Sequence, residues 1–139
     1  MVAATVAFVL GHELGHALID ILDLPVTGRQ EDAADQLATL ALADGSDEGA
    51  VMAVYAAAWF YRLGTAGKLN RLAFADEHSL GQQRFYNIIC WVYGQNPDAH
   101  QDVIDEGLLP DSRAPSCPGE YHRMAQAWET LLAAHSKVR

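Results

Sequence analysis

Residues 2–22 read VAATVAFVLGHELGHALIDIL, and within them His12-Glu13-Leu14-Gly15-His16 forms an HExxH motif. The apolar residues around the motif recur at helical spacing, and Pro25 prevents the helix from continuing far beyond Leu22. Residues four apart on a helix lie on one face, so the two imidazoles point toward one place. This stretch therefore predicts a helix that carries a paired-histidine site near the start of the chain.

The motif suits metal chemistry. Neutral imidazole nitrogen is a usual ligand of zinc, and a Glu that follows the first histidine is placed to take a proton from metal-activated water. We therefore predict His12 and His16 as zinc ligands and Glu13 as the general base. The alternative, a helix with two incidental histidines, has less support, since a chance HExxH in such a chain has a probability on the order of one in a hundred. Gly11 and Gly15 are costly inside a helix, which indicates that something approaches this face closely.

A catalytic zinc needs a third protein ligand and an open position. Glu31 and Asp35 lie one turn apart at the start of the next predicted helix. In a helix hairpin, Glu31 can reach the metal while Asp35 accepts a hydrogen bond from the free N–H of a ligand histidine. An alternative stays open, in which Glu31 and Asp32 bind no metal and are simply first-turn acids that the helix dipole favours, while Asp35 faces solvent. Asp20 and Asp32 are weaker ligand candidates.

The rest of the chain predicts an all-α fold of five to six helices in a single domain, residues 1–139. The predicted helices cover residues 2–22, 31–43, 47–63, 79–94, 96–106 and 118–135. Gly64 and Gly67 are predicted to end the third helix, Ser79 to cap the fourth, and Gly94 to end it. Residues 68–78 show no clear period.

Charge, hydropathy and cysteine content limit the possible binding partners and the possible cellular compartment. A formal net charge of −9 opposes binding to nucleic acid. The longest apolar stretch is interrupted by the motif, so we expect no membrane span, and the first ten residues lack the basic start and the cleavage site of a signal peptide. Cys90 and Cys117 are equally compatible with one disulfide or two thiols. A disulfide would favour a periplasmic or secreted protein, and otherwise the compartment stays open.

The pattern HExxH followed by ExxxD resembles the gluzincin zinc peptidases, here as residues 12–16 and 31–35. More specifically, residues 11–20, 24–29 and 31–36 are similar to bacterial metallopeptidases grouped as domain of unknown function 4344. The similarity continues through residues 74–79, 83–87, 90–94 and 117–128, so it covers nearly the whole chain. It implies zinc peptidase chemistry on a zincin-like helix near the N-terminus.

One departure from gluzincins concerns the sheet that usually precedes the motif helix and binds substrate backbone. Only 11 residues precede His12. We therefore expect this sheet to be absent or truncated, and the chain to be a minimal domain or a fragment of a longer protein.

Stabilising the developing oxyanion of peptide hydrolysis needs a donor opposite the metal. The candidates are His78, Arg84 and Tyr86, of which His78 is preferred as the catalytic residue. His100, His122 and His135 have no partner at metal-ligand spacing, and we predict that they lie at the surface.

Together these patterns predict a zinc metalloendopeptidase that acts on a peptide or protein substrate with Zn²⁺ as its cofactor. Two other functions stay open: a non-catalytic helical binding module stabilised by zinc, and a regulatory protease with one protein substrate. Cleavage specificity, the physiological metal and the oligomeric state are not determined by the sequence.

Overall fold

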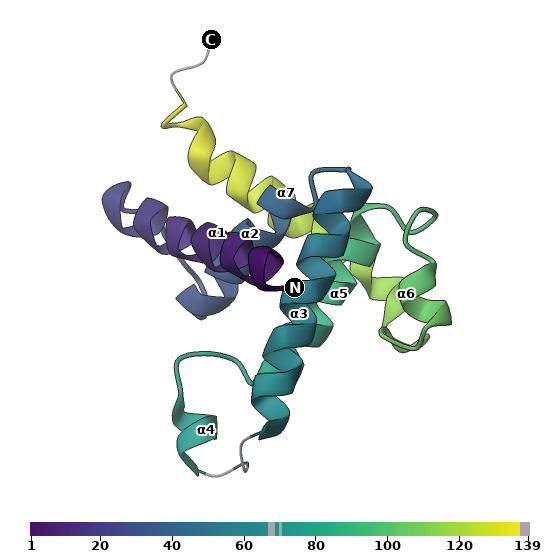
Figure 1. The fold of residues 1–139 in the computed structure, drawn as a ribbon. Helices are drawn as coiled ribbons and strands as arrows, with labels where there is room; N and C mark the ends of the chain where they lie inside the picture. The colour runs from purple at the N-terminus through teal and green to yellow at the C-terminus, as the bar shows by residue number, and fades with distance from the viewer. Residues whose placement is uncertain (67–68, 70, 137–139) are drawn as a thin grey trace.

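The computed structural model describes residues 1–66, 69 and 71–136, and this part of the chain contains helices but no strand (Figure 1). The helices are α1 Val2–Ile21, α2 Gln30–Leu42, α3 Asp47–Ala66, α4 Arg71–Ala75, α5 Gly81–Gln95, α6 Asp102–Asp105 and α7 Cys117–Ala133, with a short 3₁₀ turn at Ala114–Ser116. Five of these are long, and α4 and α6 span about one turn each. The predicted all-α fold is confirmed.

The first two helices form a hairpin in which the backbones approach very closely. A Cβ atom at Gly15 would lie 2.9 Å from the Cα of Ala34, and one at Gly11 would lie 3.1 Å from the Cα of Ala38. Real Cβ contacts are essentially never shorter than 3.0 Å, so only glycine fits at position 15, and a side chain at position 11 would require Ala38 to shift. The prediction that something approaches this face is confirmed, and the approaching element is α2.

The main core lies where α3, α5, α7 and the start of α1 meet. Its large buried side chains are Phe8, Phe60, Phe85, Ile88, Ile89, Trp91, Val92 and Met124. A disulfide between Cys90 and Cys117 joins α5 to α7, which decides between the two alternatives left open for the cysteines. This core supports α1 from one side while α2 supports it from another.

Two glycines predicted as helix stops are instead points of close packing. α5 continues through Gly94 to Gln95, and a Cβ at Gly94 would lie 2.3 Å from the carbonyl oxygen of Cys117. α3 continues through Gly64 to Ala66, because Gly64 packs against Gly81. Both predicted ends were wrong for the same reason: the glycines admit a neighbouring backbone. Gly67 lies outside the described residues.

Other helix boundaries also differ from expectation. Ser79 does not cap α5, since Leu80 is the residue before the helix and its N–H donates to the side chain of Gln83 at 3.1 Å. The Ser79 hydroxyl instead donates to Asp32 on α2 at 2.7 Å. The helix predicted over 96–106 shrinks to α6, and α4 forms in a stretch with no predicted period.

Among the described helices, α1 is the one long and apolar enough to cross a membrane by length and composition alone. The core helix of a soluble protein or a signal sequence passes the same test.

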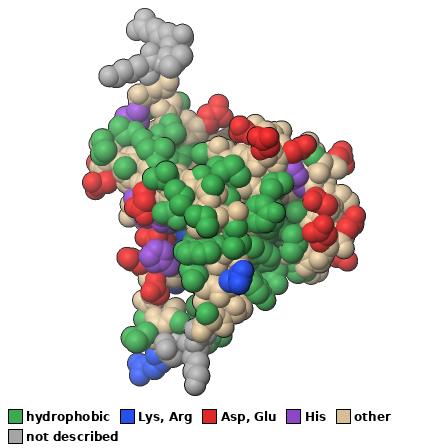
Figure 2. All heavy atoms as spheres, in the orientation of Figure 1, with side chains coloured by type: hydrophobic (Ala, Val, Ile, Leu, Met, Phe, Trp, Pro, Cys, Tyr) green, Lys and Arg blue, Asp and Glu red, His purple; other side chains and the backbone are tan. Residues whose placement is uncertain are grey.

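Hydrophobic side chains gather across the middle of the face in Figure 2, and exposed apolar residues on the helices include Val6, Leu10 and Leu14 of α1 and Val51 and Tyr55 of α3.

Candidate metal centre

The two motif histidines project from the face of α1 that packs on α2. His12 is buried, whereas the side chain of His16 is 25% exposed. Their Nε2 atoms lie 3.0 Å apart, because the four-residue spacing places both rings on the same side of the helix. Their rings meet edge to face, with centroids 4.7 Å apart. The tips of both imidazoles thus share one location.

Glu31, in the first turn of α2, reaches the same location. Its Oε2 atom lies 3.0 Å from His12 Nε2, and its Oε1 atom lies 3.3 Å from His16 Nε2. The close contact of Gly15 with Ala34 brings α2 near enough for this approach. Residues predicted as ligands from two separate stretches of sequence are therefore adjacent in the fold.

His78 comes to the cluster from the segment between α4 and α5. Its Nε2 atom lies 2.9 Å from Glu31 Oε2, and its ring is nearly parallel to that of His12. One ligand atom each from His12, Glu31 and His78 lie within 4.8 Å of one another. His78 Nδ1 donates to Asp76 Oδ1 at 3.0 Å, because a carboxylate only accepts.

Asp35 fixes the orientation of the His12 ring from behind. His12 Nδ1 donates to Asp35 Oδ1 at 2.8 Å, so the lone pair of the neutral ring lies on Nε2 and faces Glu31. Burial acts to lower the pKa of His12, but the hydrogen bond and the charge of Asp35 outweigh it, and the pKa is raised. Burial would raise the pKa of Asp35, yet the bonds from His12 and Arg84 hold that pKa below its usual value.

Arg84 on α5 completes the pairing of Asp35. Its Nε donates to Asp35 Oδ2 at 2.7 Å and its Nη2 to Asp35 Oδ1 at 2.6 Å. The guanidinium also lies over the ring of Phe60, 3.6 Å from the centroid. Arg84 therefore connects the candidate metal centre to the core, with its Nε and Nη2 donating to Asp35.

The donor set fits a divalent metal. Glu31 Oε2 is buried beside two imidazole nitrogens, yet it accepts no hydrogen bond from the described residues. Such unsatisfied buried atoms are rare unless another group meets them. Ligand atoms about 2.0–2.1 Å from a tetrahedral zinc would lie roughly 3.3 Å apart. The Nε2–Nε2 and Nε2–Oε distances of 3.0, 3.0 and 3.3 Å are close to this spacing. Two imidazoles and a carboxylate are donors that zinc and similar ions accept.

The segment that carries His78 is held against the start of α2 by hydrogen bonds. Arg29 Nη1 donates to the carbonyl oxygens of residues 76, 77 and 78 at 3.3, 3.3 and 3.0 Å. The bond from Ser79 to Asp32 adds a second attachment one turn further along α2. We call these contacts of Arg29 and Asp32 the loop clamp. It places His78 beside Glu31.

Residues 1–132 match a family model, domain of unknown function 4344, whose description is "Putative metallopeptidase". The chain belongs to this family. The description implies a metal cofactor and a peptide or protein substrate. No curated protein and no solved structure matched the chain. The predicted family resemblance is confirmed, whereas the sheet expected of gluzincins is not found among the described residues.

Glu13, the predicted general base of this family member, lies on the exposed side of α1. It makes no hydrogen bond or ion pair with the described residues, and the residue is exposed to solvent. It follows His12 by about 100° around the helix axis. The residue is thus next to the cluster without being part of its contacts.

Several weaker candidates do not join the cluster. Arg84 is committed to Asp35, and Tyr86 is part exposed with its ring against Phe85. Asp32 binds Ser79, and Asp20 is exposed. Among the other histidines, His122 and His135 are exposed and His100 is half-buried, remote from the cluster.

Sequence reasoning missed three supporting residues: Asp76, Arg29, and Arg84 in its role as partner of Asp35. Asp76 had a local signal, since an Asp two residues before a histidine can accept from both its backbone and its ring, as here. Arg29 and Arg84 act across 47 to 49 residues of chain and had no such signal.

Proposed function

We propose that this protein is a zinc-dependent metallopeptidase in which His12, His16 and Glu31 hold the metal. The observation that carries the proposal is the convergence of these three side chains, with Glu31 Oε2 buried among them and accepting no hydrogen bond from the described residues. When bound there, zinc supplies Lewis acidity that polarises a peptide carbonyl and lowers the pKa of water. The remaining chemistry belongs to the side chains of the protein.

Glu13 is the general base in this proposal. Its exposed carboxylate takes a proton from the attacking water and later gives it to the nitrogen of the leaving amine. His12 is held with Nε2 facing Glu31 because Asp35 fixes the proton on Nδ1. Asp35 keeps this orientation during the reaction, since Arg84 donates to both of its carboxylate oxygens.

His78 stabilises the oxyanion in the same proposal. In its protonated form it donates from Nε2, while Asp76 accepts from Nδ1 and holds the ring toward the cluster. Its side chain is 42% exposed, so a substrate carbonyl can approach it. The location of His78 on a segment outside the core suits a residue that must adjust to substrate.

A second candidate function is favoured by the closeness of His78 to Glu31. In its neutral form His78 offers a lone pair on Nε2 and can act as a fourth metal ligand. Four protein ligands close a zinc site and make it structural. The protein would then be a non-catalytic helical module stabilised by zinc.

The disulfide bears on where the protein acts. Disulfides persist in oxidising compartments and are rare in the cytoplasm. We therefore propose a periplasmic or secreted peptidase.

One experiment tests both functions. We would measure metal content by plasma mass spectrometry and hydrolysis of an unstructured protein for the wild type, Glu13→Gln and His78→Gln. Glu129→Gln and His122→Gln, exposed residues on α7, are matched controls. The peptidase proposal expects near-stoichiometric zinc in all five, with hydrolysis reduced by about 10²–10⁴-fold in Glu13→Gln and about 10²–10³-fold in His78→Gln.

Other outcomes separate the alternatives. Zinc lost in His78→Gln, with no hydrolysis by the wild type, would support the closed structural site. Hydrolysis that is equal in the wild type and Glu13→Gln would refute the assignment of the base, and a wild type without metal would refute both functions.

A further inference from the structure

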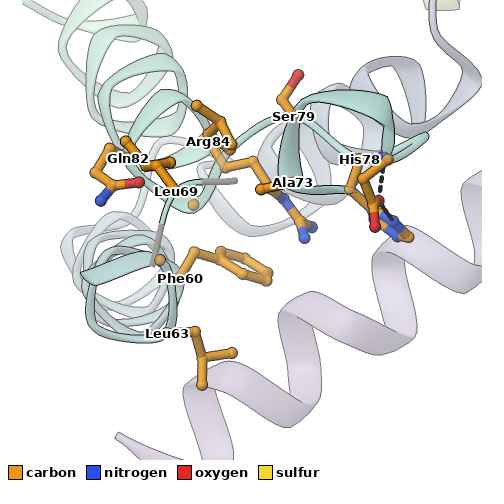
Figure 3. A pocket seen from close by; sticks show the side chains of 12 residues that line it. Phe60, Leu63, Leu69, Ala73, His78, Ser79, Gln82 and Arg84 are labelled. Carbon is orange, nitrogen blue, oxygen red and sulfur yellow. Dashed lines mark hydrogen bonds and ion pairs between the residues drawn. The ribbon is translucent and has the colours of Figure 1, made fainter. Parts of the chain in front are cut away.

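A cavity of about 350 Å³ lies between the end of α3 and the segment from α4 to the start of α5 (Figure 3). Its lining is mainly apolar and includes Phe60, Leu63, Ala73 and Leu80, with Gly64 and Gly81. Pockets that bind small organic groups have this size and this mixture of an apolar lining with a few polar side chains. A closed apolar cavity of about 150 Å³ is already large enough for benzene. The cavity therefore has room for a large apolar side chain.

The cavity is continuous with the candidate metal centre. Asp76, His78 and Arg84 line its polar end, and His78 Nε2 lies 2.9 Å from Glu31. In Figure 3 the side chains of Phe60 and Arg84 extend into the space between α3 and the segment that carries His78. A group bound beside His78 would thus be next to the metal cluster and the cavity at once.

A second observation links the cavity to a ligand. In the part of the chain that the structure describes, two buried side-chain oxygen atoms lack a hydrogen-bond partner, Glu31 Oε2 and Gln82 Oε1. The first belongs to the metal cluster, and Gln82 lines the cavity. Buried acceptors without a partner are rare in proteins, and Gln82 Oε1 lies at Gly64, where the cavity meets α3.

We propose that this cavity receives a large apolar side chain, aliphatic or aromatic, of the substrate residue next to the scissile bond. The inference rests on the proposed peptidase function, since the metal centre defines where the scissile bond lies. Arg84 then has two roles. It orients Asp35 through its hydrogen bonds, and it forms part of the cavity wall where it lies over Phe60. The apolar lining selects against charged side chains, because their burial without a partner is costly.

Peptides that differ at one position test the proposal. We would compare kcat/KM for peptides with Phe, Leu, Ala or Asp on either side of the cleaved bond. The wild type is expected to prefer Phe or Leu over Ala on one side by about 10–200-fold, the range typical of apolar pockets. Equal rates for all four residues on both sides, from an enzyme that does cleave, would overturn the proposal.

Filling the cavity should remove this preference. Ala73→Phe places a ring in the cavity, and Ala75→Phe makes the same change at an exposed position of α4 outside it. The ratio of kcat/KM for Phe over Ala peptides should fall at least tenfold in Ala73→Phe and stay at the wild-type value in Ala75→Phe. Leu63→Gln, at a half-exposed lining position, should lower the same ratio without filling the cavity. Unchanged ratios in both lining variants would contradict the proposal.

A binding measurement separates this proposal from the peptidase function. Chemical-shift perturbation with N-acetylphenylalanine amide and N-acetylalanine amide requires no turnover. The aromatic probe should bind the wild type and Ala75→Phe at least tenfold more tightly than Ala73→Phe, and the alanine probe should bind none of them. If no variant hydrolyses peptides but this pattern holds, the cavity assignment stands and the peptidase function fails. If Ala73→Phe binds the aromatic probe like the wild type, the cavity assignment fails.

Discussion

The α1–α2 hairpin and the segment between α4 and α5 both bring side chains to the candidate metal centre, but they are held there in different ways. His12 and Asp35 are buried in the hairpin, where glycine contacts fix the distance between the helices. His78 lies on a partly exposed segment that the loop clamp attaches to α2 through hydrogen bonds. Figure 1 shows the contrast, with α4 lying apart from the packed helices.

This difference suggests a division of roles. Packing of backbone against backbone leaves little freedom, which suits residues that must hold a metal at fixed distances. Hydrogen bonds to exposed carbonyl groups are weaker and permit small movements, which suits a residue that meets the substrate. Variants in the hairpin and in the His78 segment should therefore have different effects, and equal effects would mean that the two regions behave as one.

The largest effect is expected from Asp35→Asn in the hairpin. The carboxylate is the partner of both His12 and Arg84, and the Arg84 side chain is only 13% exposed. An uncompensated buried charge costs about 3–5 kcal/mol of unfolding free energy, and loss of the carboxylate behind a ligand histidine lowers metal affinity about 10–100-fold. Chemical denaturation of the metal-free protein and competition with a chelator measure the two effects.

Asp111→Asn serves as the control for that change, since Asp111 is exposed. Its unfolding midpoint and metal affinity should match those of the wild type. Wild-type values for both quantities in Asp35→Asn would mean that Asp35 does not orient His12.

Gly15→Val should also break the hairpin, with a smaller effect on stability. A side chain at this position meets the backbone of Ala34, so the helices must separate. Overpacking of this kind costs about 1–3 kcal/mol, and metal affinity falls because Glu31 moves away from the histidines. Gly28→Val is the control, since a Cβ there has no neighbour within 4 Å. Thermal unfolding and metal titration would show the idea to be wrong if both valine variants behaved alike.

Arg29→Ala tests the other region. Removal of the guanidinium leaves three carbonyl groups of the His78 segment without their donor, so His78 is no longer held beside Glu31. We expect kcat to fall about tenfold, since misplacement by even 1 Å can cost 10²-fold. The unfolding free energy should change by less than about 0.5 kcal/mol, as for most exposed positions, and metal affinity should stay the same.

Arg62→Ala, an exposed arginine on α3, is the matched control, and Arg29→Lys should restore part of kcat because lysine can also donate to carbonyl groups. If Arg29→Ala weakened metal binding as much as Gly15→Val, the two regions would act as one unit. His78 would then be better described as a fourth ligand.

The same contrast explains how much could be predicted from the sequence. The hairpin carries local signals: HExxH spacing, costly glycines within a helix, and Glu31 and Asp35 one turn apart. Each of these signals depends only on residues within about two helical turns of one another. The two helices of the hairpin and the close packing at the glycines were therefore predicted correctly.

The loop clamp and the partner of Asp35 could not be predicted in this way. Arg29 and Arg84 act on residues 47 to 49 positions away, and an arginine in a helix or a turn has the same local pattern whether or not it meets a carboxylate. The helix stops predicted at Gly64 and Gly94 were wrong because close packing and helix termination both favour glycine. α4 is too short for a hydrophobic period to appear.

The smallest effect is expected outside both regions, at the ion pair of Arg113 with Glu120 beside the disulfide, where the two N–O distances are 2.6 and 2.7 Å. The hydrogen bond from Arg113 lowers the pKa of Glu120 below 4.5. Because the folded pKa is the lower one, the pair contributes stability above the unfolded pKa and loses it as the pH falls through the folded value. The pair is partly exposed, so this contribution should be less than about 1 kcal/mol.

Glu120→Gln should therefore lower the unfolding temperature slightly at pH 7 and flatten its decline from about pH 5 downward. Metal affinity and kcat at pH 7 should not change, because Glu120 is bonded to Arg113 and, among the described residues, makes no hydrogen bond or ion pair with the hairpin or the His78 segment. This variant thus separates the loss of stability at low pH from the loss of activity at low pH. A decline as steep as that of the wild type would place the acid-sensitive group elsewhere, and Asp35, whose pKa is also lowered, would be the next carboxylate to examine.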